Sequence, residues 1–167
     1  MDLPYHTPLT PAQQRSAGIS QPQPLAMADK VRFSELDVLK HVNNAVYMAW
    51  FERLRIRYTQ DWQLSQYDSP SDPRIVIRSG TIHYREEMRM DEDYIVTCGC
   101  RTFRNTSFAL AQELWSAGRL RATFDCVIVL LTPDGSARMA LPPDLRARFE
   151  RVDGAQHEQQ SASGARS

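Results

Sequence analysis

The chain has 167 residues, and 20 Lys and Arg balance 20 Asp and Glu, so the formal net charge at pH 7 is zero. This balance gives no long-range positive field, and we expect no nucleic-acid partner. Hydrophobic residues at 42% and charged residues at 24% are typical of a folded globular protein rather than a disordered one. No apolar run approaches the roughly 20 residues that cross a bilayer, so we expect no membrane span and a cytoplasmic location.

The two ends of the chain differ in composition from the middle. Residues 1–28 hold five of the ten prolines and show no apolar periodicity, which predicts a disordered N-terminal arm. Residues 153–167 contain no large apolar side chain, which predicts a disordered C-terminal tail. One folded domain is therefore expected over residues 29–152, a length that one hydrophobic core can serve.

Cysteine spacing and missing motifs narrow the chemistry. Cys98, Cys100 and Cys126 are odd in number and lack C-x-x-C spacing, so we expect buried thiols rather than disulfides or metal ligands. The sequence contains no G-x-S-x-G elbow, no G-x-x-x-x-G-K loop and no H-E-x-x-H. We therefore expect no metal and no cofactor.

The order of expected elements indicates an α+β fold. A short strand is predicted over residues 31–34, followed by a turn and a long helix capped by Asn43 or Asn44. Aromatic and aliphatic side chains recur on one face of this helix at steps of three or four, namely Tyr47, Phe51, Leu54, Tyr58 and Trp62. Strands are predicted over residues 75–84, 94–103, 107–115 and 120–132, and a short helix over 142–151. The expected plan is an antiparallel sheet of about five to six strands wrapped around the long helix.

The loop before the long helix is the candidate reaction site. It places a carboxylate, Asp37, and an imidazole, His41, close to the helix N-terminus. Unpaired N–H groups in the first helical turn can stabilise the oxyanion that forms when a carbonyl is attacked. A partly desolvated Asp37 could attack the carbonyl or take a proton from the attacking water. Alternatively, Asp37 only ties a turn and His41 only donates a hydrogen bond.

The loop and helix read Asp37-x-x-x-His41-Val42-Asn43-Asn44-x-x-Tyr47-x-x-x-Phe51-Glu52-x-x-Arg55. This run resembles hot-dog-fold acyl thioesterases, the 4-hydroxybenzoyl-CoA thioesterase-like superfamily. Residues 81–84 with 90–96 are similar to the second and third strands of that family, and residues 142–145 to its closing helix. The resemblance covers about residues 31–151. It implies a hot-dog fold and hydrolysis of a fatty or aromatic acyl-CoA to free acid and CoA, in lipid metabolism.

The resemblance also implies roles for individual residues. Asp37 falls on the catalytic aspartate, which acts as nucleophile or general base, and Asn44 on the helix start whose N–H holds the carbonyl oxygen. His41 matches the histidine of the plant acyl-ACP thioesterase pattern D-x-N-x-H, but Leu39 replaces the asparagine, so His41 is either an acid/base or a lining residue. Glu52 is the alternative catalytic carboxylate if Asp37 points away, although pairing with Arg53, Arg55 or a neighbouring strand is the more expected role.

Substrate contacts and assembly follow from the same resemblance. Arg104 and Ser107 lie where the family often meets CoA, although a solvated hairpin corner is an equal expectation. Residues expected to bind the rest of the substrate are Asn43, Ala45, Tyr47, Met48 and Phe51. The fold leaves a sheet edge and a face that a homodimer or homotetramer covers. An acyl-ACP thioesterase and a non-catalytic acyl-CoA-binding module of the same fold remain alternatives, whereas the H-F-P-type loop of the dehydratases is absent.

Overall fold

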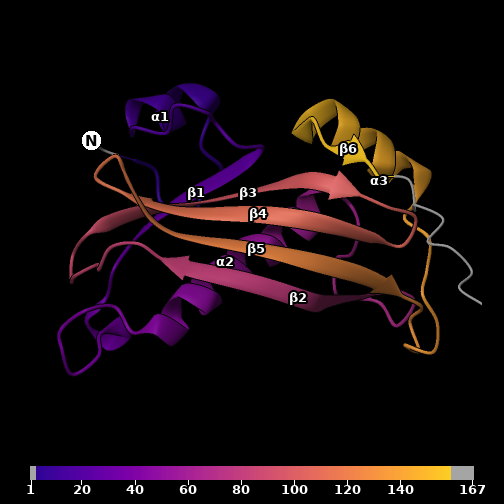
Figure 1. The fold of residues 1–167 in the computed structure, drawn as a ribbon, viewed down its shortest axis with the longest axis horizontal. Helices are drawn as coiled ribbons and strands as arrows, with labels where there is room; N and C mark the ends of the chain where they lie inside the picture. The colour runs from indigo at the N-terminus through magenta and orange to yellow at the C-terminus, as the bar shows by residue number, and fades with distance from the viewer. Residues whose placement is uncertain (1–2, 159–167) are drawn as a thin grey trace, which may run out of the picture.

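The structure is a computed structural model, and it describes residues 3–158. Its elements in chain order are α1 (Pro11–Ser16), β1 (Leu25–Lys30), the 3₁₀ turn η1 (Phe33–Glu35), α2 (Asn44–Asp61), β2 (Arg74–Tyr84), β3 (Asp93–Phe103), β4 (Ser107–Ser116), β5 (Arg119–Leu131), α3 (Pro143–Arg148), the π-helical turn η2 (Phe149–Asp153) and β6 (Gln156–His157) (Figure 1).

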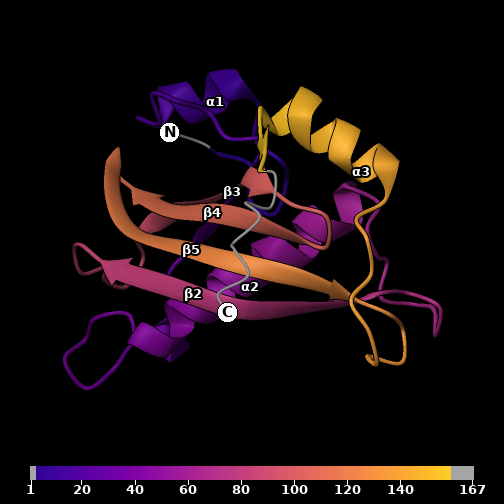
Figure 2. The ribbon, with the colours of Figure 1, turned by 45° about the vertical axis from the view of Figure 1, so that its right-hand side comes forward.

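One sheet organises the molecule. Its strands lie in the order β1-β3-β4-β5-β2, all antiparallel to their neighbours, and the short β6 pairs in parallel with β3. The helix α2 crosses one face of the sheet, and α1 lies on the opposite side (Figures 1 and 2). The helix α3 meets the C-terminal end of α2, where the Arg148 guanidinium lies over the Trp62 ring at 4.6 Å. The expected α+β plan of a long helix wrapped by an antiparallel sheet is confirmed.

The long helix forms as its sequence predicts. The Asn43 side chain caps it by accepting a hydrogen bond from the Ala45 N–H at 3.0 Å. All five side chains of the predicted stripe are buried against the sheet, and Phe51 stacks on Phe124 of β5 with ring centroids 5.7 Å apart. The aromatic stripe is therefore part of the core.

The four long strands agree with their predicted ranges within one residue at each end, and tight turns join β3 to β4 and β4 to β5. The closing helix is shorter than expected, because residues 149–153 continue it as a π-helical turn. Phe149 in that turn is fully buried between Phe103 and Phe108. The C-terminal segment thus closes the core beside the β3–β4 hairpin.

The prediction of a disordered N-terminal arm is wrong for residues 3–28. These residues form α1 and most of β1, and the strand expected at residues 31–34 lies earlier, with η1 in its place. Leu9 and Ile19 are buried against Ala26, Ala28 and Ile95, which face away from α2. The N-terminal segment folds because the outer face of β1 and β3 gives it an apolar surface to cover.

The predicted tail also begins too early. Residues 153–158 are ordered, since β6 pairs with β3 and Asp153 is a hydrogen-bond acceptor within the core. Residues 159–167, like residues 1 and 2, lie outside the described residues. All three cysteines are free and buried, as expected. Among residues 3–158 there is no helix with the length and apolar character needed to cross a membrane.

Candidate active site

The residues between β1 and α2 form a narrow hairpin at the lower left of the molecule (Figure 1). Leu36 and Val42 pair across it, and the Asp37 N–H donates to the His41 carbonyl at 2.8 Å. The Lys40 N–H donates back to the Asp37 carbonyl at 3.0 Å, which closes a turn, and Lys40 has a φ of +62°. Local hydrogen bonds therefore set the backbone of this loop.

Asp37 occupies the first position of this turn. Its Oδ1 accepts hydrogen bonds from the Leu39 N–H at 2.8 Å and the His41 N–H at 3.2 Å. Its Oδ2 has no hydrogen-bond partner within residues 3–158. One carboxylate oxygen thus ties the turn while the other is available to a water or a substrate, so the two roles considered for Asp37 are compatible.

The N-terminus of α2 begins directly after this hairpin. Its first N–H groups are those of Asn44, Ala45 and Val46, of which the last two donate to the Asn43 side chain and carbonyl. The Asn44 N–H has no acceptor in the part of the chain that the structure describes, and Asn44 is exposed. An unpaired N–H at the positive end of an 18-residue helix is suited to hold an oxyanion.

His41 is held by a residue that the sequence did not indicate. Its Nε2 lies 3.1 Å from Oε2 of Glu87 in the β2–β3 connection, and Oε1 of Glu87 accepts from Arg89 at 2.6 Å. The hydrogen bond from Arg89 and the charges of His41 and Arg89 lower the pKa of Glu87. The connection is docked against the hairpin because the Val42 N–H donates to the Met88 carbonyl at 2.8 Å. No sequence signal links positions 46 residues apart.

Tyrosines lie beside the helix start. The Tyr84 hydroxyl donates to the Asn44 carbonyl at 3.0 Å, and the Tyr47 ring meets the Tyr84 ring edge-on at 5.2 Å. Burial raises the pKa of Tyr47 to about 12. Tyr47 and Phe51, expected to contact substrate, are buried in the core, whereas Met48 is half-buried and Ala45 exposed. Tyr84 was not expected in the site.

Arg104 and Ser107, which were expected to bind CoA, lie far from Asp37. Arg104 and Ser107 share a hydrogen bond in the β3–β4 turn, and Arg104 pairs with Glu158 at 2.9 Å. The Asp37 hairpin docks on the chain just before β3, whereas this turn follows β3, which is 11 residues long. The separation is therefore about 35 Å along the sheet. Within a single chain Arg104 and Ser107 cannot join the site of Asp37.

The alternative carboxylate Glu52 is exposed on α2 and makes no ion pair or hydrogen bond within residues 3–158. The arginines expected to pair with it have other partners, since Arg53 binds Asp29 at 3.1 Å and Arg55 binds Gln112 at 3.0 Å. The expected structural pairing of Glu52 is therefore wrong.

Among residues 3–158, the main cavities do not open at the candidate site. A cavity of about 40 Å³ between β1 and α2 and a cleft of about 640 Å³ beside the N-terminal segment are lined by neither Asp37, His41 nor Asn44. The candidate reacting groups thus lie at the surface of the chain. Within residues 3–158, no three His, Cys, Asp or Glu side chains are grouped so as to hold a metal ion.

Comparison with known proteins places this chain in a family. Residues 31–149 match the Thioesterase-like superfamily. The chain belongs to this superfamily. A thioesterase superfamily protein from Jannaschia sp. CCS1 is 37% identical with a TM-score of 0.85, covering 91% of this chain and 97% of that one. The hot-dog fold expected from the Asp37–Arg55 run is confirmed.

Two structures of this superfamily's fold contain coenzyme A. A thioesterase from Thermus thermophilus, complexed with coenzyme A and Zn, is 26% identical with a TM-score of 0.68, covering 79% of this chain and 96% of that one. A Staphylococcus aureus protein in complex with CoA is 15% identical with a TM-score of 0.72, covering 85% and 92%, and shows similarity of fold alone. A comparison with curated proteins finds no significant match.

Proposed function

We propose that this member of the thioesterase-like superfamily hydrolyses acyl-CoA thioesters, with Asp37 as general base or nucleophile and the Asn44 N–H as oxyanion donor. One observation carries the proposal: a free carboxylate oxygen and an unpaired helix N–H lie at the same junction of hairpin and helix. The thioesterase relative that binds coenzyme A supports the choice of carrier.

The chemistry follows from these two groups. Asp37 takes a proton from water, and the water oxygen bonds to the thioester carbonyl carbon. The resulting oxyanion accepts a hydrogen bond from the Asn44 N–H, which stabilises it. The C–S bond then breaks, and the CoA thiolate receives a proton, giving free acid and thiol. In the nucleophilic variant Asp37 itself bonds to the carbon, and water hydrolyses the resulting anhydride.

His41 is the second titratable group of the proposed site. With Nε2 held by Glu87 at 3.1 Å, the ring has a defined orientation, and the His41 backbone N–H donates to Asp37 at 3.2 Å. We assign it to proton transfer toward the leaving thiolate, a role that a positioned imidazole performs well near neutral pH.

The test is thiol release from a panel of acyl-CoAs, from short to long and from aliphatic to aromatic. Asp37→Asn should lower kcat by about 100-fold or more with an unchanged circular dichroism spectrum. Asp144→Asn, an exposed carboxylate at the start of α3, is the matched control. Equal turnover by Asp37→Asn and wild type would refute the role of Asp37. If folded protein released no thiol from any acyl-CoA, the proposed substrate would change to acyl-ACP, or the proposed function would change to acyl-CoA binding without hydrolysis.

We further propose that two copies pair through β2. Its only strand partner among residues 3–158 is β5, and its exposed apolar side chains are Val76, Ile77 and Tyr84, which are 38%, 41% and 47% exposed. An apolar edge strand of this kind is a template for another strand. Two-fold antiparallel pairing would also bring the Arg104 end of one copy toward the Asp37 end of the other.

Light scattering after size-exclusion chromatography tests this assembly. Wild type should elute at twice the chain mass of 19.1 kDa, or at a multiple of that dimer, and Ile77→Lys at the monomer mass. Val152→Lys, which charges an apolar side chain of similar exposure in η2, should leave the mass unchanged. Monomeric wild type would refute the pairing.

A further inference from the structure

Glu35 makes hydrogen bonds to three parts of the molecule that surround the candidate site. Its Oε1 accepts a hydrogen bond from Trp50 Nε1 in α2 at 2.9 Å, and its Oε2 accepts from the Arg32 N–H at 2.8 Å. Its carbonyl accepts from the Asn43 N–H at 2.9 Å. The side chain is only 12% exposed. Glu35 thus joins the start of the hairpin, its end and the second turn of α2.

These contacts close the hairpin that carries Asp37. The Asn43–Glu35 bond lies just outside the Leu36–Val42 pair, and the Asp37–His41 bond lies just inside it. The end of the hairpin is also held by the β2–β3 connection, through Val42 and Met88, whereas its tip residues Val38 and Leu39 are exposed. The direction of Asp37 relative to the Asn44 N–H therefore depends on where the base of the hairpin is held.

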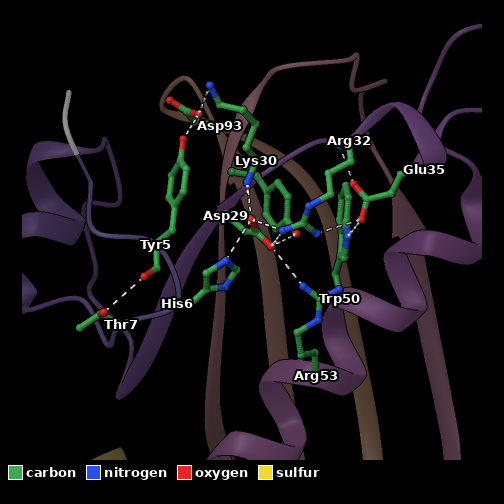
Figure 3. Close-up of polar contacts among 11 residues, drawn as sticks. Tyr5, His6, Thr7, Asp29, Lys30, Arg32, Glu35, Trp50, Arg53 and Asp93 are labelled. Carbon is green, nitrogen blue, oxygen red and sulfur yellow. Dashed lines mark hydrogen bonds and ion pairs between the residues drawn. The ribbon is translucent and has the colours of Figure 1, made fainter.

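A charge network around the buried Asp29 supports Glu35 from the side of β1 (Figure 3). The Asp29 carboxylate is 8% exposed and accepts from Arg32 Nη2 at 3.0 and 3.1 Å and from Arg53 Nη1 at 3.1 Å. Arg32 is held by its side chain at Asp29 while its N–H donates to Glu35. Because Arg53 and Trp50 are both on α2, Asp29 and Glu35 attach the same helix to the hairpin base.

We propose that Glu35 is a positioning residue, which aligns the Asp37 carboxylate with the Asn44 N–H by fixing the hairpin base to α2. The inference rests on the proposed hydrolysis. Glu35 touches no reacting atom, because its carboxylate oxygens are both occupied by Trp50 and Arg32. Displacing a reacting group by about 1 Å can cost 100-fold in rate, so a residue that acts only through Asp37 has a measurable effect.

The test is a double-mutant cycle between Glu35 and Asp37, read in steady-state kinetics. Glu35→Ala should lower kcat by about tenfold or more and change KM less than threefold. Glu35→Gln, which keeps one acceptor oxygen, should recover at least part of that loss. In an Asp37→Asn background Glu35→Ala should change the residual rate less than twofold, because its effect passes through Asp37. The exposed Glu150→Ala is the control, expected to match wild type.

Hydrogen exchange separates failure of this inference from failure of the proposed function. Glu35→Ala should raise amide exchange of residues 36–43 by about tenfold, and Glu150→Ala should not, whether or not thioesters are hydrolysed. Unchanged exchange in Glu35→Ala would overturn the inference, as would a loss of kcat that is equally large in the Asp37→Asn background. Increased exchange in a protein that releases no thiol would overturn the proposed function while leaving Glu35 as the anchor of the hairpin.

Discussion

Gly18 and Gly118 bring two chain segments into backbone contact. A Cβ added to Gly18 would lie 2.6 Å from the Gly118 Cα, closer than such atoms approach in proteins. Both residues have positive φ, +93° and +71°, a region that favours glycine. Gly18 follows α1 and Gly118 is in the β4–β5 turn, so this contact docks the N-terminal segment on the end of the sheet.

Gly18→Ala should therefore loosen the whole N-terminal segment. The added methyl group clashes with backbone that cannot move aside, and the positive φ adds strain, so we expect a loss of about 2–3 kcal/mol in the free energy of unfolding. Gly154→Ala is the matched control, because Gly154 has a φ of +65° but no atom within 4 Å of an added Cβ. It should lose only about 1 kcal/mol. Urea unfolding measures the stability of both variants. Equal losses would show that Gly18→Ala is destabilised by backbone strain alone, without a contribution from the clash with Gly118.

The contact between Gly18 and Gly118 shows why the order of the N-terminal segment could not be predicted from the sequence. Periodicity identified α2 and the long strands, since each presents a regular apolar pattern to one core. Residues 3–24 contribute few large buried side chains, chiefly Leu9 and Ile19, and are held by a glycine contact and by Gln14, which bonds to Leu9 and Gln23. Such contacts form only when the sheet has folded, and they produce no regular apolar spacing in the sequence.

The same distinction applies to the site. Asp37, His41 and the α2 N-terminus are close in sequence, and the turn hydrogen bonds of residues 37–41 are local, so the sequence alone predicts that these groups lie near one another. Tyr84 ends β2 and Glu87 lies in the β2–β3 connection, both far from the loop in sequence, so neither could be assigned before the fold was known. Glu35 was visible in the loop, but its role depends on Trp50, 15 residues away.

Lys40 offers a test of strain in the candidate site. Its φ of +62° is in the left-handed region, and its side chain is exposed. The left-handed backbone costs a non-glycine residue about 1–2 kcal/mol, which exceeds the extra unfolded-state entropy of glycine. Lys40→Gly should therefore be more stable than Lys40→Ala by about 0.5–1 kcal/mol. Thermal unfolding compares the two variants, neither of which retains the charge, and a less stable glycine variant would contradict the argument.

Asp153 is expected to be the most important acceptor at the far end of α2. Its Oδ2 accepts from the Tyr58 hydroxyl at 2.5 Å and the Cys100 N–H at 2.7 Å, and its Oδ1 accepts from Trp62 Nε1 at 2.9 Å. Asp153→Asn places an NH₂ group against one of these donors, and an unsatisfied buried donor costs about 1–3 kcal/mol. Urea unfolding at pH 7 should show that loss, whereas Asp144→Asn, which is exposed, should be neutral.

Three buried tyrosines predict the response to alkali. Burial raises the pKa of Tyr47 to about 12 and also raises those of Tyr58 and Tyr94 well above their usual value. An unfolded tyrosine has a pKa of about 10. Since the folded values are higher, the folded protein keeps protons that the unfolded chain releases. This contribution to stability is fully present below pH of about 10 and is lost as the pH rises toward the folded values.

Absorbance at 295 nm counts the ionised tyrosines directly. Of the six in the chain, these three should ionise only as circular dichroism reports loss of structure, and the urea midpoint should fall from about pH 10 upward. Tyr94→Phe keeps the ring stacked on Trp50 at 4.1 Å and loses only a long contact of 3.4 Å with Asp29, so it should weaken the pH dependence while preserving the fold. Ionisation of all six tyrosines near pH 10 with the dichroism unchanged would contradict the burial on which this expectation depends.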